Sequence, residues 1–163
     1  MLNQALIPEF KHEAASTRKI LERVPFDNPD WKPHEKSYTL ARMAGHVAEI
    51  MQWTAATINT EGLDFAKGEY KPFFPTSKDE LLERFDAHYQ EALSLLENVS
   101  DENLKSNWTL QHGDHVIFTL PKIATLRSFV MNHLIHHRGQ LSVYLRLLDV
   151  PVPGMYGPSA DEK

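Results

Sequence analysis

Two histidines at helical spacing are the side chains in this sequence with the clearest chemical potential. They are His133 and His137, in the segment NHLIHHRGQ. Residues four apart on a helix lie one turn above each other, so their imidazoles can converge on one ion. Neutral imidazole is a common ligand of zinc and other divalent metals. The pair therefore predicts a divalent-metal site on the helix that carries it.

That helix is expected to run from Pro121 to about Leu148. A helical wheel at about 100° per residue places both histidines with apolar residues in one sector of about 60°. The members of this sector are Leu126, Val130, His133, His137, Leu141, Tyr144 and Leu148. Two buried imidazoles need partners for their polar nitrogens, which a shared metal ion would supply. His136 points about 100° away from His137, beside this stripe, and is interpreted as a flanking group.

A second helix, expected over residues 38–59, supplies a candidate third ligand. His46 shares one face of this helix with residues of a packed core. These residues are Thr39, Met43, Ile50, Trp53 and Thr57. Glu49 lies one turn further on, about 60° to the side, where it could orient a ligand, coordinate the metal or act as a base. Three imidazoles with open coordination positions are typical of catalytic rather than structural metal sites.

Structural interpretations compete with the metal site at each of these positions. A core-facing histidine such as His46 is often only a hydrogen-bonded core residue. A pair of histidines four residues apart also arises by chance fairly often in a chain with nine histidines. His88 has a weaker case as a ligand. His112 and His115 would line the site only if the segment that contains them folded over it, and as loop residues they are otherwise solvated.

The segments that must position these side chains are predicted to be amphipathic helices. The helical segments are residues 8–24, residues 38–59, a segment that begins at Ser77, and residues 121–148. Each shows apolar residues at helical spacing, and Ser77 with Glu80 three residues later is a capping-box pattern. Four long amphipathic helices predict an all-α four-helix bundle, formed by a single domain over residues 1–163.

The connections between these helices differ in character. Residues 25–37 contain three prolines and several Asp and Asn turn formers, which predict a loop. Residues 60–76 contain two glycines and two prolines, which predict a long irregular crossover. Residues 106–120 alternate apolar and polar side chains around a His-Gly-Asp sequence. That alternation suggests a short hairpin or an extended loop before the last helix.

The composition narrows the classes of function. The chain has 163 residues, no cysteine and a formal net charge of −5. The lack of cysteine excludes disulfides, thiolate metal sites and cysteine nucleophiles, and it suits a reducing cytoplasm. No cluster of lysine and arginine favours a nucleic-acid partner, and no apolar run approaches the roughly 18 residues of a membrane span. The N-terminus lacks the features of a signal peptide. We therefore expect a cytoplasmic protein that has a small-molecule substrate and neither a nucleic-acid nor a membrane partner.

Two segments of the sequence resemble the DinB/YfiT-like superfamily. LARMAGHVAEIMQW, residues 40–53, is similar to the signature of its second helix. NHLIHHRGQLSVYLRLLDVPVP, residues 132–153, is similar to its C-terminal signature. The resemblance implies an antiparallel four-helix bundle with a long crossover. It also implies a divalent metal, commonly nickel or zinc, held by three histidines, which carry over to His46, His133 and His137. Of the neighbouring motif residues Arg138, Gly139 and Gln140, none is a ligand in the family pattern.

The resemblance also bears on the reaction and on assembly. The superfamily is associated with thiol-dependent S-transferases and isomerases that use low-molecular-weight thiols, and with metal hydrolases. We therefore expect a metal-dependent enzyme of the thiol S-transferase or hydrolase type, with Glu49 as a weaker candidate for a base. The alternatives are a non-catalytic metal- or ligand-binding module in stress response, and a structural bundle with accidental histidines. A homodimer is common among similar chains, and apolar residues beside the core stripes, Ile20, Leu82 and Leu95, suggest a dimer interface.

Overall fold

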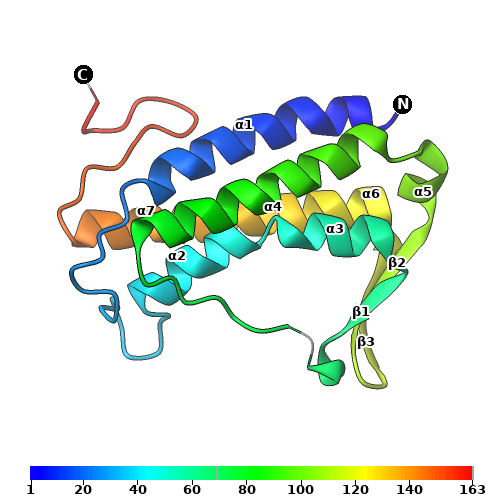
Figure 1. The fold of residues 1–163 in the computed structure, drawn as a ribbon, viewed down its shortest axis with the longest axis horizontal. Helices are drawn as coiled ribbons and strands as arrows, with labels where there is room; N and C mark the ends of the chain where they lie inside the picture. Colours follow the sequence, from blue (N-terminus) through cyan, green and yellow to red (C-terminus); the bar gives the residue numbers. More distant parts are fainter. Residues whose placement is uncertain (69, 163) are drawn as a thin grey trace.

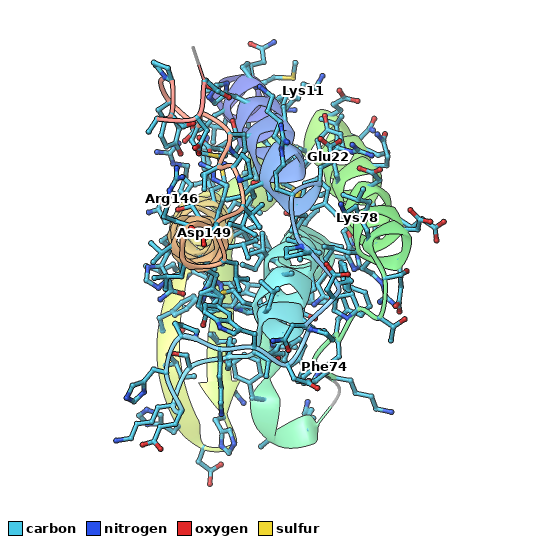
Figure 2. The ribbon with its side chains drawn as sticks, turned by 90° about the vertical axis from the view of Figure 1, so that its left-hand side faces the viewer. Lys11, Glu22, Phe74, Lys78, Arg146 and Asp149 are labelled. Atoms are coloured by element: carbon cyan, nitrogen blue, oxygen red, sulfur yellow. The ribbon has the colours of Figure 1, made fainter. Side chains whose placement is uncertain are left out.

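The computed structural model describes residues 1–68 and 70–162, and within this part of the chain four helical rods lie side by side (Figure 1). α1 and α4 are single helices, the second rod is α2 followed by α3, and the last is α6, a π-helical turn η2 and α7. Their bounds are α1 Asn3–Leu21, α2 Leu40–Glu49, α3 Gln52–Asn59, α4 Lys78–Asn98, α6 Lys122–Thr125, η2 Leu126–Met131 and α7 Asn132–Leu147. In the view turned by 90°, the rods surround a packed interior of side chains (Figure 2).

A three-stranded sheet lies at one end of the four helical rods (Figure 1). The prediction of an all-α fold is therefore wrong. β2 (Asn107–His112) and β3 (His115–Pro121) form an antiparallel hairpin, where the sequence suggested a hairpin or extended loop. β1 (Gly62–Asp64) pairs with β2 as a parallel strand, inside the segment expected to be irregular. The 3₁₀ turn η1 (Phe65–Lys67) follows β1, and the short helix α5 (Asp101–Lys105) precedes β2. The fold is therefore mixed, with helices and a sheet, and is not a pure four-helix bundle.

α1 begins earlier than the sequence predicted. It starts at Asn3 rather than at residue 8, and Pro8 lies inside it. Pro8 removes one internal hydrogen bond from the helix. Contacts with the rest of the chain hold the extra turn, because Nδ2 of Asn3 donates to the Leu96 carbonyl of α4 at 2.9 Å. Tertiary contacts rather than local sequence therefore set where α1 begins.

The helix predicted over residues 38–59 is interrupted in the core. Thr39 caps α2 by accepting a hydrogen bond from the Arg42 N–H at 3.2 Å. A turn at Ile50 and Met51 then separates α2 from α3, and both of these side chains are fully buried. α2 packs on α7 and α4, which brings its candidate ligand next to the last rod.

The last rod is also not the continuous α-helix expected from residues 121–148. η2 is a π-helical turn, whose wider hydrogen-bonding pattern shifts the helical phase before α7 begins. The buried residues of α7 are Leu134, Arg138, Leu141, Tyr144 and Leu145. His133 and His137 are half-buried on the flank of this stripe. The face assigned to them from the sequence is therefore only partly right, and they line a wall of the interior rather than its centre.

The start of α4 agrees with the sequence prediction, whereas the apolar patch suggested as a dimer interface does not. Ser77 caps α4 as predicted, because its hydroxyl accepts from the Glu80 N–H at 3.2 Å. The apolar residues suggested as a dimer interface are not exposed, since Ile20 is fully buried and Leu82 and Leu95 pack partly buried against the core. Among the described residues, no helix is long and apolar enough to cross a membrane.

Candidate metal centre

Three imidazoles meet between α2 and α7. His46 of α2 and His133 and His137 of α7 each offer one ligand atom, and these atoms all lie within 4.8 Å of one another. The Nε2 atoms of His46 and His133 are 3.2 Å apart. Two nitrogens on one tetrahedral zinc would lie roughly 3.3 Å apart, given Zn–N bonds of about 2.0–2.1 Å. The structure therefore brings together the three histidines that the sequence singled out, at a spacing that one metal ion can bridge.

The other candidate histidines do not join this cluster. His112 and His115 are exposed at the ends of β2 and β3 that flank the hairpin turn. His136 is exposed, and its ring packs on that of His137 with centroids 4.8 Å apart. His88 of α4 is half-buried and lies outside the cluster found among the described residues.

A buried carboxylate holds the ring of His46. Glu49 is 2% exposed, and its Oε1 lies 3.2 Å from Nδ1 of His46. The same oxygen accepts hydrogen bonds from Nη1 of Arg42 at 2.9 Å and from the Tyr70 hydroxyl. The other oxygen accepts the Phe73 backbone N–H at 3.0 Å. Nη2 of Arg42 also lies 3.4 Å from this Nδ1, but the contact with Glu49 is shorter. We therefore assign the proton to Nδ1, which donates to the ionised carboxylate, and this tautomer leaves the lone pair of Nε2 free for a metal.

The crossover into α4 reaches Glu49 because α2 carries a glycine at the point of contact. A Cβ atom at Gly45 would lie 2.3 Å from the Phe73 carbonyl oxygen and 2.8 Å from Cδ of Pro75. Any side chain at Gly45 would therefore push the crossover outward. That movement would take the Phe73 N–H and the Tyr70 hydroxyl away from the carboxylate that they now hydrogen-bond.

Arg42 balances the buried charge of Glu49. Its Nη2 also donates to the Tyr70 hydroxyl at 2.9 Å. Its guanidinium lies over the rings of Tyr38 and Phe74, 5.2 and 5.7 Å from their centroids, which is the geometry of a cation–π contact. The ion pair beside His46 is thus covered by two aromatic side chains at the protein surface.

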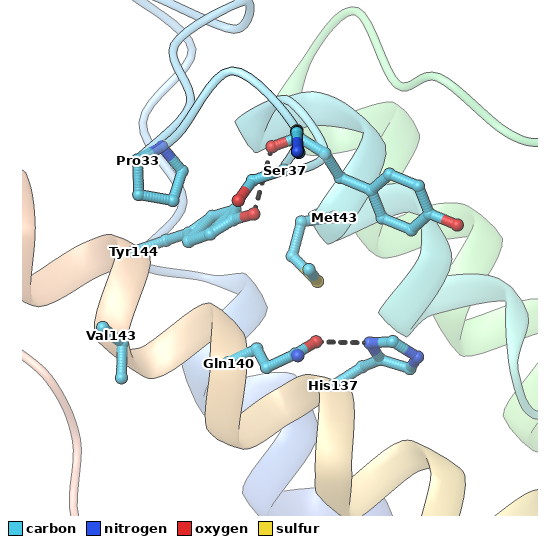
Figure 3. A pocket seen from close by; sticks show the side chains of 9 residues that line it. Pro33, Ser37, Met43, His137, Gln140, Val143 and Tyr144 are labelled. Carbon is cyan, nitrogen blue, oxygen red and sulfur yellow. Dashed lines mark hydrogen bonds between the residues drawn. The ribbon is translucent and has the colours of Figure 1, made fainter.

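Gln140 orients His137 in a similar way. Its Oε1 lies 2.7 Å from Nδ1 of His137 (Figure 3). An amide oxygen only accepts, so Nδ1 of His137 donates and its Nε2 remains available. Nδ1 of His133 is buried and has no hydrogen-bond partner within the part of the chain that the structure describes.

Aromatic rings close the His133 side of the cluster. The ring of Phe129 packs 5.9 Å from that of His133 and 5.7 Å from that of Trp53, as measured between centroids. Trp108 and Phe118, from the sheet, pack on Phe129 in turn, at 5.9 and 5.7 Å. This side of the cluster is therefore apolar and well packed.

The His137 side opens into a pocket of about 500 Å³ (Figure 3). The loop between α1 and α2, α2 itself and α7 form its walls. The lining residues are Pro33, Lys36, Ser37, Tyr38, Met43, His137, Gln140, Val143 and Tyr144. Its volume lies within the range of small-molecule sites, about 300–1,000 Å³. A small molecule in this pocket would contact His137 directly.

Burial and neighbouring charges set the protonation states in the cluster. Burial, followed by the adjacent His46, lowers the pKa of both His133 and His137 from 6.5 to about 4. Burial alone would raise the pKa of Glu49, but hydrogen bonds from His46 and Tyr70 and the charge of Arg42 outweigh it, so that this pKa is lowered. At neutral pH the centre therefore presents neutral imidazoles on α7 and an ionised carboxylate beside His46.

Comparison of the sequence with known protein families identifies the family of this chain. The model of the DinB family matches residues 1–163, the whole chain. The chain belongs to the DinB family. The uncharacterized protein YrdA of Bacillus subtilis (strain 168) is 29% identical to it over 159 residues, which cover 96% of this chain and 89% of YrdA.

Solved structures of DinB-like proteins share this fold. A DinB-like protein of Bacillus cereus ATCC 10987 superposes with a TM-score of 0.72 at 22% identity, over 94% of this chain and 97% of the other. The DinB-like protein YjoA of Bacillus subtilis superposes with a TM-score of 0.71 at 18% identity, over 98% and 99%. At these identities the likeness supports the fold of this DinB-family chain and does not extend to its reaction.

Sequence reasoning named Glu49 as a group that could orient a ligand, but it missed the contacts that Arg42, Tyr70 and Gln140 make around the histidines. Arg42 and Gln140 each lie within one helical turn of a histidine of the cluster, so their spacing could have indicated a contact. Tyr70 lies in the crossover, where no periodicity relates it to α2. Its contact with Glu49 depends on the path of the chain, which the sequence pattern does not give.

The lowered pKa values predict that acid destabilises the metal-free DinB-family chain. His133 and His137 take up protons near pH 6.5 in the unfolded chain but only near pH 4 in the folded chain. Acidification between these values therefore favours unfolding, and the stability contributed by the neutral histidines is complete only above about pH 6.5. Urea midpoints measured with a chelator present should fall across this window, and they should fall less steeply in a variant that lacks both histidines. Equal slopes for the two proteins would contradict the prediction.

Proposed function

We propose that this DinB-family chain is a divalent-metal-dependent enzyme of the thiol S-transferase or hydrolase type. The observation that supports it most is the cluster of three imidazoles, whose ligand atoms lie within 4.8 Å of one another: His46 is buried, and the half-buried His137 lines a pocket. His46, His133 and His137 would hold the metal. Three neutral imidazoles suit borderline metals such as zinc and nickel, which are also the metals that the family resemblance implies.

The side chains around the cluster fit such a metal. Hydrogen bonds to Glu49 and Gln140 occupy Nδ1 of His46 and of His137, so that each presents Nε2. An oriented imidazole of this kind is the usual surrounding of a histidine that binds a metal. Without a metal, the Nε2 atoms of His46 and His133, at 3.2 Å, could share at most one proton.

A bound divalent metal would lower the pKa of a thiol or water coordinated to it, which gives a nucleophile near neutral pH. The chain itself would supply orientation and access. Glu49 is buried, and its hydrogen bonds occupy both oxygens, so we assign it to holding His46 rather than to accepting a proton from substrate. The pocket would admit the substrate at His137, and the packed rings around Phe129 would exclude water from the His133 side.

The alternative is a non-catalytic module that binds a metal or ligand. A site sealed by Trp108 and Phe118 would favour that function. These two rings lie beyond Phe129, on the side opposite the pocket, and His137 lines a cavity of about 500 Å³. Direct access of a small molecule to one of the histidines favours the enzyme.

Metal analysis and a metal-dependence assay test the proposal together. Protein purified without a histidine tag or chelating resin should contain about one zinc or nickel per chain. The metal-loaded protein should accelerate either the attack of a small thiol on an electrophilic aryl halide or the hydrolysis of an activated ester. A chelator should abolish this rate. Metal-loaded protein that accelerates neither reaction would favour the non-catalytic module, and protein that takes up no metal would contradict both.

Replacement of Glu49 by glutamine is expected to weaken metal binding by about 10–100-fold, the usual effect of removing a group that orients a ligand. The amide keeps the shape of the side chain but loses the charge that holds Nδ1–H of His46. Competition with a chromophoric chelator measures the affinity. Glu83→Gln, at an exposed position of α4, is the control and should leave the affinity unchanged. Equal affinities for the two variants would contradict the role assigned to Glu49.

Dimerisation is a further prediction, and it rests on the family resemblance. Of the apolar residues first offered in its support, Ile20 is fully buried and Leu82 and Leu95 are partly buried against the core, so they do not form an exposed apolar patch. The monomer mass is 18.7 kDa, and light scattering should give twice that value for a homodimer. A monomer mass that stays constant as the protein is concentrated would contradict the prediction.

A further inference from the structure

We propose that the pocket beside His137 binds a small, largely apolar molecule that carries one negative charge at the end remote from the histidine cluster. The choice of the His137 end as the reactive end rests on the function proposed above. The rest of the argument comes from the walls of the pocket.

Apolar side chains form one wall of the pocket. Met43, Val143 and the ring of Tyr144 line it, and Val143 is 57% exposed in the chain alone. The Tyr144 hydroxyl donates to the Tyr38 carbonyl at 3.1 Å, and the rings of Trp31 and Tyr144 form a T-shaped contact with centroids 5.7 Å apart. The polar end of Tyr144 is therefore already used, which leaves its ring to contact a bound molecule. A concave wall of this kind favours an apolar ligand body.

The polar groups that remain unused in the pocket include a cation and an amide donor but no carboxylate. Lys36 is the one residue of the lining with a formal charge at neutral pH. Within residues 1–68 and 70–162 its ammonium group forms no ion pair. Gln140 gives its oxygen to His137, so its amide N–H groups are left to donate. Two unused donors and no carboxylate in the lining favour an anionic or acceptor-rich ligand.

We infer the charged end of the ligand from Lys36, which lines the pocket and precedes Ser37 in the chain. Ser37, its neighbour in the chain, lies across the pocket from His137 (Figure 3). A ligand that extends from His137 along Met43 and Val143 would place its far end near Lys36. We infer that an apolar chain or ring separates the group that reaches the metal from an anionic group such as a carboxylate.

Calorimetric titration with two matched probes tests this inference. 4-Phenylbutyrate has an apolar body and a carboxylate, and 4-phenylbutanol has the same body without the charge. We expect the zinc-loaded protein to bind both in the millimolar range and to bind the acid more tightly. Lys36→Met should lower the affinity for the acid by about two- to fivefold, the usual effect of losing an exposed ion pair. It should leave the affinity for the alcohol unchanged. Lys105→Met, at an exposed position of α5, is the control.

A second pair of variants tests the apolar wall. Val143→Asp should lower the affinity for both probes by more than about tenfold, because it places a charge in the wall that contacts the apolar body of the ligand. Leu147→Asp is a matched control on the same helix, since Leu147 is also 57% exposed and does not line the pocket. Both substitutions are at exposed positions, so both variants should fold. Equal effects of the two substitutions would overturn the assignment of the pocket.

Repeating the titrations after removal of the metal separates this inference from the proposed function. Preference for the acid should persist without metal if the carboxylate lies at Lys36. A preference that disappears with the metal, together with no effect of Lys36→Met, would overturn the assignment of the charged end. Metal-loaded protein that binds neither probe would contradict the proposed ligand of the pocket but would remain consistent with the metal centre. Protein that takes up no metal but binds the acid through Lys36 would contradict the proposed function and support the pocket.

Discussion

Replacement of His133 or His137 by alanine is expected to abolish stoichiometric metal binding. Each substitution removes one of three imidazoles whose ligand atoms lie within 4.8 Å, and two imidazoles cannot complete the site. Since loss of a group that only orients a ligand costs about 10–100-fold in affinity, loss of a ligand should cost more than roughly 100-fold. Metal content after dialysis against a trace of free metal measures the effect.

The neighbouring histidine provides the control for this prediction. His136→Ala should retain about one metal per chain, because His136 is exposed and lies outside the cluster. Circular dichroism should show unchanged helix content in all three variants, since the fold has an extensive apolar core of its own. A His133→Ala protein that kept its metal while the His136→Ala protein lost it would refute the proposed ligand set.

Breaking the buried ion pair between α1 and α7 is expected to destabilise the fold by about 3–5 kcal/mol. Nη2 of Arg138 lies 2.7 Å from Oε2 of Glu13, and the two side chains are only 2% and 6% exposed. Arg138 also donates to the Thr17 hydroxyl at 3.2 Å and to the Tyr156 hydroxyl at 2.7 Å, and this second contact holds the C-terminal segment. Glu13→Ala would leave a buried guanidinium without its counter-charge.

An exposed pair between the same two rods gives a matched control. Arg127 of η2 pairs with Glu9 of α1, with side chains that are 48% and 35% exposed. Glu9→Ala should change stability by less than about 1 kcal/mol, whereas Glu13→Ala should lower the Tm by roughly 6–20 °C for a domain of this size. Thermal unfolding of the two variants makes the comparison. Equal shifts would mean that burial does not distinguish the two pairs.

The clustering of His46, His133 and His137 could be predicted because the signal for it is local. Four-residue spacing places His133 and His137 on adjacent turns of any helix, even though η2 shifts the phase before them. His46 was placed on the correct side of α2 by the apolar residues around it. The helical rods and the hairpin before the last of them were also visible in the sequence, because periodicity and turn residues mark them.

The features that could not be predicted depend on contacts between distant parts of the chain. β1 has three residues, too few to show alternation, and it exists only because Gly62 lets the backbone approach β2, where a Cβ would lie 2.5 Å from the Thr109 carbonyl oxygen. The all-α prediction is wrong because this strand and the β2–β3 hairpin form a sheet. Likewise, Tyr70 meets Glu49, and Arg138 meets Glu13 and Tyr156, through the path of the chain rather than through any repeat.

X-ray absorption at the metal edge tests most directly whether the three histidines hold a divalent metal. For zinc-loaded, untagged protein we predict about three imidazole nitrogens at about 2.0–2.1 Å, together with one or more non-histidine light-atom ligands at positions that a substrate could take. The His137→Ala protein should not give this signal. A wild-type spectrum without imidazole scattering, or with a number of histidines that is unchanged in the His137→Ala protein, would contradict the assignment of the centre to His46, His133 and His137.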